Sequence, residues 1–337
     1  MKTKVPLISV CIPLFETEMF LAQCLESVLF QDYDDFEVVI VSDASNGKDA
    51  KGRKAKKIIS KTERDSKKRR TASGFDPVSV KFIEHHENRG LIEVRRTLVY
   101  EARGQYILML DSDDVMEEGA LKAFSKNLGP DIVHGTSTAG SFSEDGTFTP
   151  SKLNRYGAIF YGTIEGHDIF HRWLINNEYT ANTWGKCIKR ELFDKAFENI
   201  PYTECNMAED VLLFFFISQN AKSYLGIKDK VCRYRINTGM SSARKIDSLN
   251  RWKMICSTAG VFTILSSNIE NLEPDEVEKL RELTRSYLAN NIRQMHETVI
   301  PSLLPEARQM LCDYWGQSFV DRAEQAMNCS SMAPVVR

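Results

Sequence analysis

Short apolar runs alternate with amphipathic stretches over the first 120 residues of the chain. Apolar runs of strand length that lack a helical period predict buried strands at 7–14, 36–41, 78–83 and 106–110. Apolar residues recur at helical spacing in 19–29 and 91–102, which predicts two helices between those strands. Strands that alternate with helices are typical of a parallel sheet with right-handed crossovers.

The remainder of the chain has a less regular pattern that becomes helical toward its end. Residues 136–157 are polar and rich in Gly, Ser and Thr, which predicts a loop. Further helices are expected at 166–177, 190–197, 246–265, 274–299 and 306–326, and a strand is expected at 231–236. We therefore expect one domain over 1–242, with halves 1–120 and 121–242, and a helical C-terminal region over 243–337.

Polar and charged residues follow the ends of the predicted strands. Glu16, Asp43, Asn88 with Arg89, and Asp111–Asp114 each come directly after, or within a few residues of, a strand end. Ligands of open α/β sheets bind beyond the carboxyl ends of the strands, so these residues are expected along one edge.

The acidic turn Asp111-Ser112-Asp113-Asp114 is the strongest chemical signal in the chain. Neighbouring carboxylates repel and raise each other's cost of ionising, and a divalent cation removes that conflict. Mg²⁺ and Mn²⁺ prefer hard oxygen ligands and commonly share substrate phosphates with one or two carboxylates. The turn thus indicates a metal–diphosphate site. The alternative is a solvated turn that caps the next helix.

Composition narrows the class of protein. With 337 residues, 42% hydrophobic and 27% charged, the chain has the balance of a globular protein with one large domain or two smaller ones. The net charge of −2 does not favour a nucleic-acid partner. The eight cysteines include no Cys-x-x-Cys pair, so a zinc ribbon is not supported and a reducing, cytoplasmic setting is expected. The chain shows neither a secretory signal nor an apolar run of about 20 residues, so any membrane contact is expected to be peripheral.

One segment departs strongly from the average charge. Residues 48–74 contain twelve Lys and Arg against three Asp and Glu, a formal charge of +9 that leaves −11 for the rest of the chain. The segment reads either as a solvated, partly helical crossover or as a surface that attracts anionic lipid or a polyanionic acceptor.

Several short motifs occur in a fixed order along the chain. They are VCIPLFE at 10–16, VVIVSDAS at 38–45, ENRGL at 87–91, LDSDD at 110–114, NTWGK at 182–186, AEDV at 208–211 and YRIN at 234–237. Together they resemble glycosyltransferase family 2, the inverting nucleotide-sugar transferases with the GT-A fold. The resemblance is strong over 7–120 and moderate over 180–242. It departs at Ala44, where the family often has Gly.

This resemblance implies a Rossmann-like, mostly parallel central sheet flanked by helices, with a C-terminal helical extension. It also implies metal-dependent transfer of a sugar, with UDP as the expected nucleotide, to a glycan or lipid-linked acceptor in surface polysaccharide, lipooligosaccharide or glycoprotein glycan synthesis. Mn²⁺ or Mg²⁺ is the implied cofactor, bound by Asp111 and Asp113. The implied donor-binding residues are Pro13, Phe15, Glu16, Asp43, Asn88, Arg95, Asp111, Ser112 and Arg235.

Asp210 is the implied general base, and Trp184, Lys186 and Glu209 are the implied acceptor residues. Structural alternatives stand beside these roles: Trp184 as a core residue, and Glu209 with Asp210 as acids favoured at a helix N-terminus. At the level of function, the alternatives are a catalytically degenerate binding protein and a sugar-nucleotide nucleotidyltransferase. Contact with an anionic membrane through 48–74 or the C-terminal helices is left open, as is an oligomer.

Overall fold

The computed structural model of the chain describes residues 5–143, 145–152, 157–236, 238 and 245–330, and only the backbone of 328–330. The chain forms two compact units. Unit 1 comprises Met1–Thr203 and Leu213–Ser242, and unit 2 comprises Glu204–Leu212 and Ala243–Arg337. The second stretch of unit 2 begins at Ala243, and the assignment of Glu204–Leu212 to unit 2 had no signal in the sequence.

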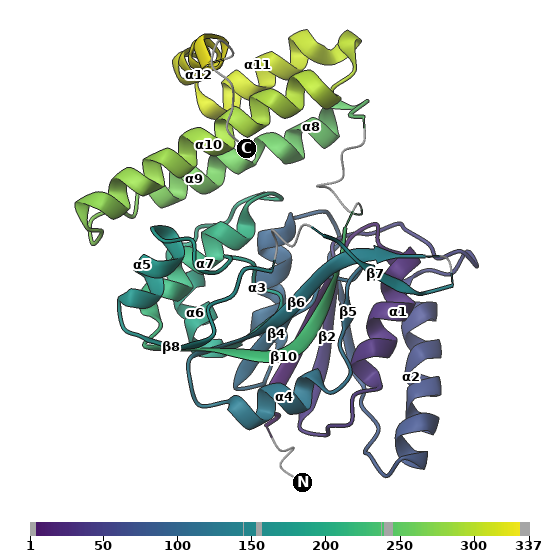
Figure 1. Ribbon diagram of the computed structural model, residues 1–337. Helices are drawn as coiled ribbons and strands as arrows, with labels where there is room; N and C mark the ends of the chain where they lie inside the picture. Colours follow the sequence, from purple (N-terminus) through teal and green to yellow (C-terminus); the bar gives the residue numbers. More distant parts are fainter. Residues whose placement is uncertain (1–4, 144, 153–156, 237, 239–244, 331–337) are drawn as a thin grey trace. The chain divides into compact units, whose positions relative to one another are not determined.

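Unit 1 is built on a ten-stranded mixed sheet whose strand order is β3-β2-β1-β4-β9-β6-β10-β5, with β7 paired to β6 and β8 paired to β10. Figure 1 shows this sheet with helices on both sides. Its strands are β1 Ile8–Leu14, β2 Phe36–Ser42, β3 Val80–Glu84, β4 Tyr106–Met109, β5 Val115–Met116, β6 Ile132–Phe142, β7 Phe148–Pro150, β8 Gly162–Glu165, β9 Lys186–Lys189 and β10 Ser223–Arg235.

The first half of the sheet is parallel, as the alternation of strands and helices predicts. The strands β3, β2, β1 and β4 run parallel, and Leu14 of β1 is in register with Ser42 of β2. On the other side of β1, Cys11 is in register with Met109 at the end of β4. The carboxyl ends of these strands therefore meet at one edge. Beyond β4 the sheet is mixed, because β9 pairs antiparallel with both β4 and β6.

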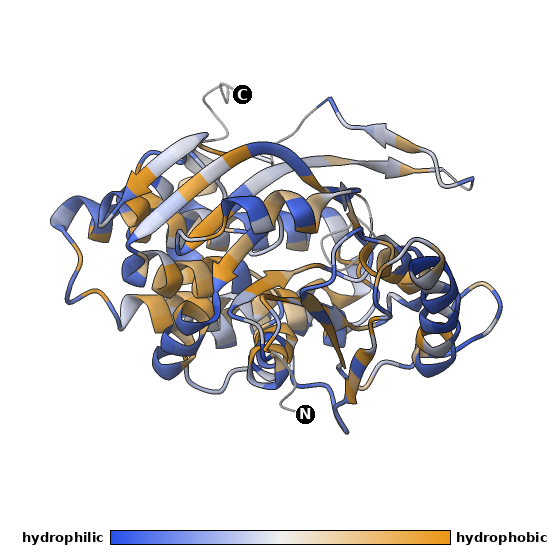
Figure 2. Cartoon of the chain, turned by 90° about the horizontal axis from the view of Figure 1, so that it is seen from below, coloured by the Kyte–Doolittle hydropathy of each residue, from blue (hydrophilic) through white to orange (hydrophobic). Residues whose placement is uncertain are grey.

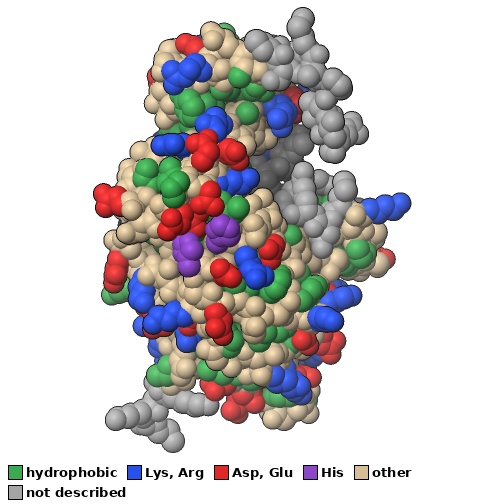
Figure 3. Space-filling model, turned by 60° about the vertical axis from the view of Figure 1, so that its left-hand side comes forward, with side chains coloured by type: hydrophobic (Ala, Val, Ile, Leu, Met, Phe, Trp, Pro, Cys, Tyr) green, Lys and Arg blue, Asp and Glu red, His purple; other side chains and the backbone are tan. Residues whose placement is uncertain are grey.

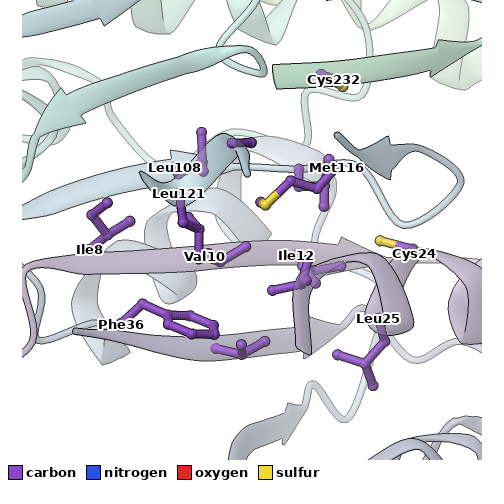
Figure 4. Packing of buried hydrophobic residues seen from close by; sticks show 14 of the residues in the cluster. Ile8, Val10, Ile12, Cys24, Leu25, Phe36, Leu108, Met116, Leu121 and Cys232 are labelled. Carbon is purple, nitrogen blue, oxygen red and sulfur yellow. The ribbon is translucent and has the colours of Figure 1, made fainter. Parts of the chain in front are cut away.

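The main core of unit 1 lies between the sheet and three helices. The helices of unit 1 are α1 Glu18–Leu29, α2 Ala55–Ala72, α3 Leu91–Glu101, α4 Ala120–Asn127, α5 Asp168–Leu174, α6 Arg190–Asn199 and the greater part of α7 Glu209–Asn220. Ile8, Val10 and Ile12 of β1 belong to one buried cluster with Leu25 of α1 and Leu121 of α4 (Figure 4). The same cluster includes Ile58 and Ile59 of α2. Helices α3 and α6 lie on the other side of the sheet (Figure 1), and the buried strands are predominantly apolar (Figure 2).

The prediction of a loop over 136–157 is wrong for its first part, because β6 extends through Phe142. The strand is paired on both sides, with β9 at its start and with β10 along most of its length. A Cβ atom added at Gly135 would lie 2.4 Å from a methyl group of Val231, so the close approach of β10 requires a residue without a side chain there. The small polar residues in the first part of this segment therefore belong to a largely buried strand.

Unit 2 contains five helices among its described residues, which confirms the expected helical C-terminal region. They are α8 Leu249–Cys256, α9 Thr258–Ser266, α10 Pro274–Thr298, α11 Leu304–Trp315 and α12 Gln317–Ser330, with a 3₁₀ turn at Pro301–Leu303. Each of two helices expected as continuous is divided, one of them at Gly316, whose φ of 88° ends α11. Trp252 anchors the core by donating its indole N–H to the carbonyl of Ala307. No helix among the described residues combines the length and apolar content needed to cross a bilayer.

Candidate functional site

The turns that follow β1 and β2 are tied together at the carboxyl edge of the parallel strands. The backbone N–H of Asp43 donates to the carbonyl of Leu14 at 2.9 Å. The N–H of Glu16 donates to the Ser45 hydroxyl at 2.8 Å, and the carboxylate of Glu16 accepts from the N–H of Asn46 at 3.1 Å. Pro13 is buried in β1, whereas Phe15 beyond it is 36% exposed. The two turns therefore form a joined rim with one exposed aromatic ring.

Asp43 is almost completely buried and holds the segment that leads into α3. Its carboxylate accepts hydrogen bonds from the backbone N–H groups of Arg89 and Gly90, at 2.9–3.1 Å, and lies 2.8 Å from Nδ1 of His85. Nε2 of His85 in turn lies 3.0 Å from the Thr97 hydroxyl. The contacts that the structure shows for Asp43 thus fix the segment 85–90, on which Asn88 is exposed at the rim.

The three carboxylates of the acidic turn lie in different environments. Asp111 has a side chain that is 27% exposed, and its Oδ1 lies 3.6 Å from Nη2 of the buried Arg95. Asp113 accepts a hydrogen bond from the Thr238 hydroxyl at 2.8 Å. Asp114 is fully buried and accepts from the backbone N–H of Arg235 at 2.7 Å. Asp111 and Asp113 are thus partly accessible to solvent, whereas Asp114 lies in the interior.

The electrostatics of the turn favour an added cation. Burial raises the pKa of Asp113, and the Thr238 hydrogen bond and the Arg235 charge only partly oppose this. Burial, together with the charges of Asp113 and Asp111, raises the pKa of Asp114 well above its ordinary value. Oδ2 of Asp114 is buried and has no hydrogen-bond partner among the described residues. A divalent cation beside these carboxylates would favour their ionised forms, so the donor set fits a metal.

Arg235, from the end of β10, clamps the acidic turn to α1. Its Nε donates to the carbonyl of Asp113 at 2.7 Å and its Nη2 donates to Oε1 of Gln23 at 2.6 Å. The guanidinium also lies between the rings of Phe20 and Phe142, at 4.5 and 4.1 Å from their centroids. These contacts show Arg235 supporting the turn, and its implied role in donor binding stays a prediction.

Arg95 and Ser112 link the turn to two other segments. Arg95 is 1% exposed and hydrogen-bonds through Nη1 to the Thr183 hydroxyl. The Ser112 hydroxyl lies 2.6 Å from that of Thr17, just before α1. The acidic turn is therefore held by α1, α3, the segment before β9 and the end of β10, which are distant in sequence.

Trp184 and Lys186 lie in the interior rather than on a surface. Trp184 is 5% exposed, and its ring stacks on Tyr234 with centroids 4.8 Å apart. Lys186 is fully buried, and its ammonium donates to the carbonyls of Thr180 and Asn182 at 2.9 and 2.5 Å. The cause is the position of β9 between β4 and β6. The structure favours the core interpretation of Trp184 and shows Lys186 holding the loop before β9.

Glu209 and Asp210 are the first two residues of α7, and both belong to unit 2. They follow Ala208, which has a left-handed φ of 60°, and they form the acidic first turn of the helix. Burial raises the pKa of Tyr287 on α10 to about 12, and the charges of Glu209 and Asp210 add to this rise. Within unit 2, the backbone N–H of Asn206 donates to the Ser257 hydroxyl at 3.1 Å and so links the stretch Glu204–Leu212 to α8 and α9.

Three side chains of the site had no signal in the sequence, namely Thr17, Gln23 and Thr238, and His85 was read from it as structural. Each acts through a partner that is remote along the chain, such as Gln23 with Arg235. Of the described His, Cys, Asp and Glu side chains, no group of three or more is arranged to hold a metal ion by itself.

Comparison with known proteins adds a family to this geometry. The model of the family described as "Glycosyl transferase family 2" matches residues 9–197, more than half of the chain. The glycosyltransferase GlyA of Streptococcus pneumoniae serotype 4 is 26% identical over 241 residues, covering 70% of this chain and 31% of that protein. The minor teichoic acid biosynthesis protein GgaB of Bacillus subtilis is 24% identical over 251 residues, covering 72% of this chain and 24% of that protein. The matches span less than a third of either relative.

Two solved structures share the fold. The S. aureus TarS 1–349 structure in complex with UDP-GlcNAc is 18% identical, with a TM-score of 0.50, and the match covers 95% of this chain and 92% of that one. The mannosyltransferase PcManGT from Pyrobaculum calidifontis, in complex with GDP-Man and Mn²⁺, is 15% identical, with a TM-score of 0.51 over 98% of this chain and 88% of that one. At these identities the likeness concerns the fold, and it confirms the predicted GT-A architecture.

Proposed function

We propose, on the premise that the chain belongs to glycosyl transferase family 2 and is a glycosyltransferase, that it transfers a sugar from a nucleotide diphosphate to a hydroxyl with inversion and with the help of a divalent metal. The observation that carries the proposal is the acidic turn at the shared edge of β1, β2 and β4. Its carboxylates are crowded, and burial raises the pKa of Asp113 and Asp114, so a nearby cation would favour their ionised forms.

Asp111 and Asp113 would hold the metal, which we propose to be Mn²⁺ or Mg²⁺. When bound, the metal supplies positive charge that stabilises the departing diphosphate. Two carboxylates plus phosphate oxygens are a usual ligand set for Mg²⁺, which agrees with the absence of a third protein ligand among the described His, Cys, Asp and Glu residues. Asp114, anchored by the Arg235 N–H, orients the turn from beneath.

The nucleotide would lie over the joined rim formed by the turns after β1 and β2. Phe15 offers an exposed ring for a base, and Glu16 and Asn88 offer polar groups beside it. We propose that Asp43, one of the implied donor-binding residues, reads the base, because a carboxylate accepts well from a base N–H. Its contacts with Arg89 and Gly90 also give it a positioning role. UDP is the proposed nucleotide, in keeping with the UDP-GlcNAc complex of TarS.

Asp210 is the proposed general base. It would take the proton of the acceptor hydroxyl as that oxygen attacks the anomeric carbon from the face opposite the diphosphate. One bond forms, the bond to the diphosphate breaks, and a single displacement inverts the configuration. Glu209, adjacent in the same helical turn, would orient the acceptor. We propose a glycan or lipid-linked acceptor, since the relative GgaB is named for teichoic acid biosynthesis.

The donor is tested by thermal unfolding and slow hydrolysis with a panel of UDP- and GDP-sugars, in Mn²⁺, Mg²⁺ or EDTA. A donor at a hundredfold excess over its Kd should stabilise the native state by about 2.7 kcal/mol, and EDTA should remove most of this. Asp111→Asn and Asp113→Asn should lose the metal-dependent part. A donor effect that is indifferent to EDTA and to both substitutions would contradict the proposed metal site.

The base is tested by Asp210→Asn. Turnover with an acceptor should fall by about 10²–10⁴, as expected for loss of a general base, while the donor-induced stabilisation persists. Asp168→Asn is a matched control, because Asp168 is exposed in the first turn of α5. Donor binding without hydrolysis or transfer by the unaltered protein would instead support a catalytically degenerate binding protein.

A further inference from the structure

The outer face of α2 is strongly basic. Helix α2 spans Ala55–Ala72 within the basic segment 48–74 and buries Ile58, Ile59, Thr62 and Ser66 against the rest of the unit. The opposite face is exposed, and the helix in the right-hand part of Figure 2 shows its hydrophilic residues there. Six of the exposed basic side chains are Lys56, Lys57, Lys61, Arg64, Lys67 and Lys68.

Most of these charges form a row along the helix axis. Lys57, Lys61, Arg64 and Lys68 recur at intervals of three and four residues, so they share one face. With a rise of about 1.5 Å per residue, the row from Lys57 to Lys68 is about 17 Å long. The row borders a shallow depression on the surface. Basic side chains between Arg53 and Lys68 surround this depression, and Asp65 is the one acidic residue among them.

Intramolecular pairing leaves most of the charge uncompensated. Lys61 pairs with Asp65 at 2.5 Å, and Lys56 pairs with Glu84. Within the described part of the chain, Lys57, Arg64, Lys67 and Lys68 make no ion pair. By contrast, acidic and basic side chains are interspersed on the face of the molecule shown in Figure 3. A single-sign row of this kind raises the energy of the isolated protein slightly through self-repulsion and favours an anionic partner.

We propose that the outer face of α2 docks on an anionic lipid bilayer. The row is exposed, straight and dominated by lysine, so several ammonium groups can approach one plane of phosphate and carboxylate headgroups together. Recognition of a single polyanionic chain would instead be expected to use aromatic platforms or bidentate arginines, and lysine predominates on this face. Since the exposed residues of the row are polar, docking is electrostatic adsorption without insertion of side chains into the hydrocarbon.

The charges near a membrane act additively and are screened by salt. Each basic side chain held near an anionic surface contributes about a fivefold factor to the partition coefficient, so removal of three should weaken binding by about a hundredfold. The Debye length falls from about 8 Å at physiological ionic strength to about 3 Å at 1 M salt, which should release the protein. Neutral vesicles should not bind it.

The test is co-sedimentation of the full chain with vesicles of phosphatidylcholine, alone or with about 30% phosphatidylserine. The variant Lys57→Gln/Arg64→Gln/Lys68→Gln removes three charges that make no ion pair. The control Lys122→Gln/Lys126→Gln/Lys195→Gln removes three exposed charges from α4 and α6. We expect about a hundredfold loss of binding to acidic vesicles for the first variant and little loss for the control.

Equal binding to neutral vesicles, equal losses in the two variants, or capture by soluble polyphosphate without any binding to acidic vesicles would each overturn the proposal. Release of the unaltered protein by salt provides a measurement that does not depend on how the variants fold. Metal-dependent donor hydrolysis in solution should be the same in all three proteins, because none of the altered residues belongs to the candidate site. Membrane docking and the proposed transfer reaction therefore fail or succeed separately.

Discussion

At the scale of single residues, the turn after β2 carries a backbone conformation that its side chain disfavours. Ala44 has a φ of 55°, in the left-handed region, at the position where the family often has Gly. A left-handed conformation costs a residue with a Cβ atom about 1–2 kcal/mol, whereas Gly adopts it freely. The departure from the family motif is therefore a strained version of the same turn, and the turn geometry survives it.

Replacement of Ala44 by Gly should relieve this strain. We expect the free energy of unfolding to rise by about 0.5–1 kcal/mol, less than the full relief because Gly also gains freedom in the unfolded chain. Urea unfolding monitored by tryptophan fluorescence measures the change. Ala123→Gly, in the middle of α4, is the control and should lower stability by about 1 kcal/mol. A loss at Ala44 as large as that at Ala123 would show that the turn is not strained.

The sequence predicted the charged residues of the site better than their supports. Asp111 and Asp113 stand out in the sequence because neighbouring carboxylates after an apolar run repel one another, and their roles as metal ligands stay predictions. Gln23 and Thr238 could not, since their roles arise only when β10 brings Arg235 and the following residues against the acidic turn. A polar residue on a helix face can make many different contacts. Which contact it makes depends on the strands, remote in sequence, that pack against the helix. The roles of Asp43 and Asp210 stay predictions.

At the scale of elements, β6 shows why a polar composition misled the loop prediction. Loops and tightly packed central strands both use Gly, Ser and Thr, the first for backbone freedom and the second for close approach, as at Gly135. In contrast, β1, β2 and β4 were predictable because parallel strands covered on both faces are continuously apolar. The same sheet thus contains strands that the pattern reveals and one that it hides.

The strand β6 also carries a buried histidine that should make stability depend on pH. His134 is 2% exposed, and its Nδ1 lies 2.9 Å from the Tyr224 hydroxyl. Burial, and to a lesser degree the charge of Lys186, lowers the pKa of His134 well below its ordinary value. The unfolded chain therefore takes up a proton near pH 6.5 that the native protein does not, and stability falls as the pH drops below that value.

We expect His134 to contribute a slope of at most about 1.4 kcal/mol per pH unit between pH 6.5 and 5. In His134→Asn this part of the slope should disappear, although overall stability falls at neutral pH. Unfolding midpoints at several pH values measure it, with His86→Asn, at an exposed position, as the control. An unchanged slope in His134→Asn would mean that the imidazole accepts its proton in the folded state.

At the scale of the whole molecule, the cysteines are distributed as in a protein kept reduced. The seven cysteines with described side chains are free and buried, as expected for Cys11 and Cys24. Burial raises the pKa of each thiol, for Cys256 to about 12, and the thiolate is the form that reacts. Native protein should therefore release at most one equivalent of thionitrobenzoate rapidly from Ellman's reagent. Unfolded protein in guanidinium should release eight, and two or more fast thiols in the native state would contradict this burial.

The helix α7 belongs to two units, and this has a consequence for biosynthesis. Glu204–Leu212 groups with Ala243–Arg337 although 30 residues of unit 1 separate them. A ribosome makes Asn206, Glu209 and Asp210 well before it makes Ser257 and Tyr287, the partners of that stretch. A nascent chain can thus complete the turns proposed to bind the donor while its proposed base still lacks its surroundings. Maturation of the site then depends on helices that are translated after both turns and after α7.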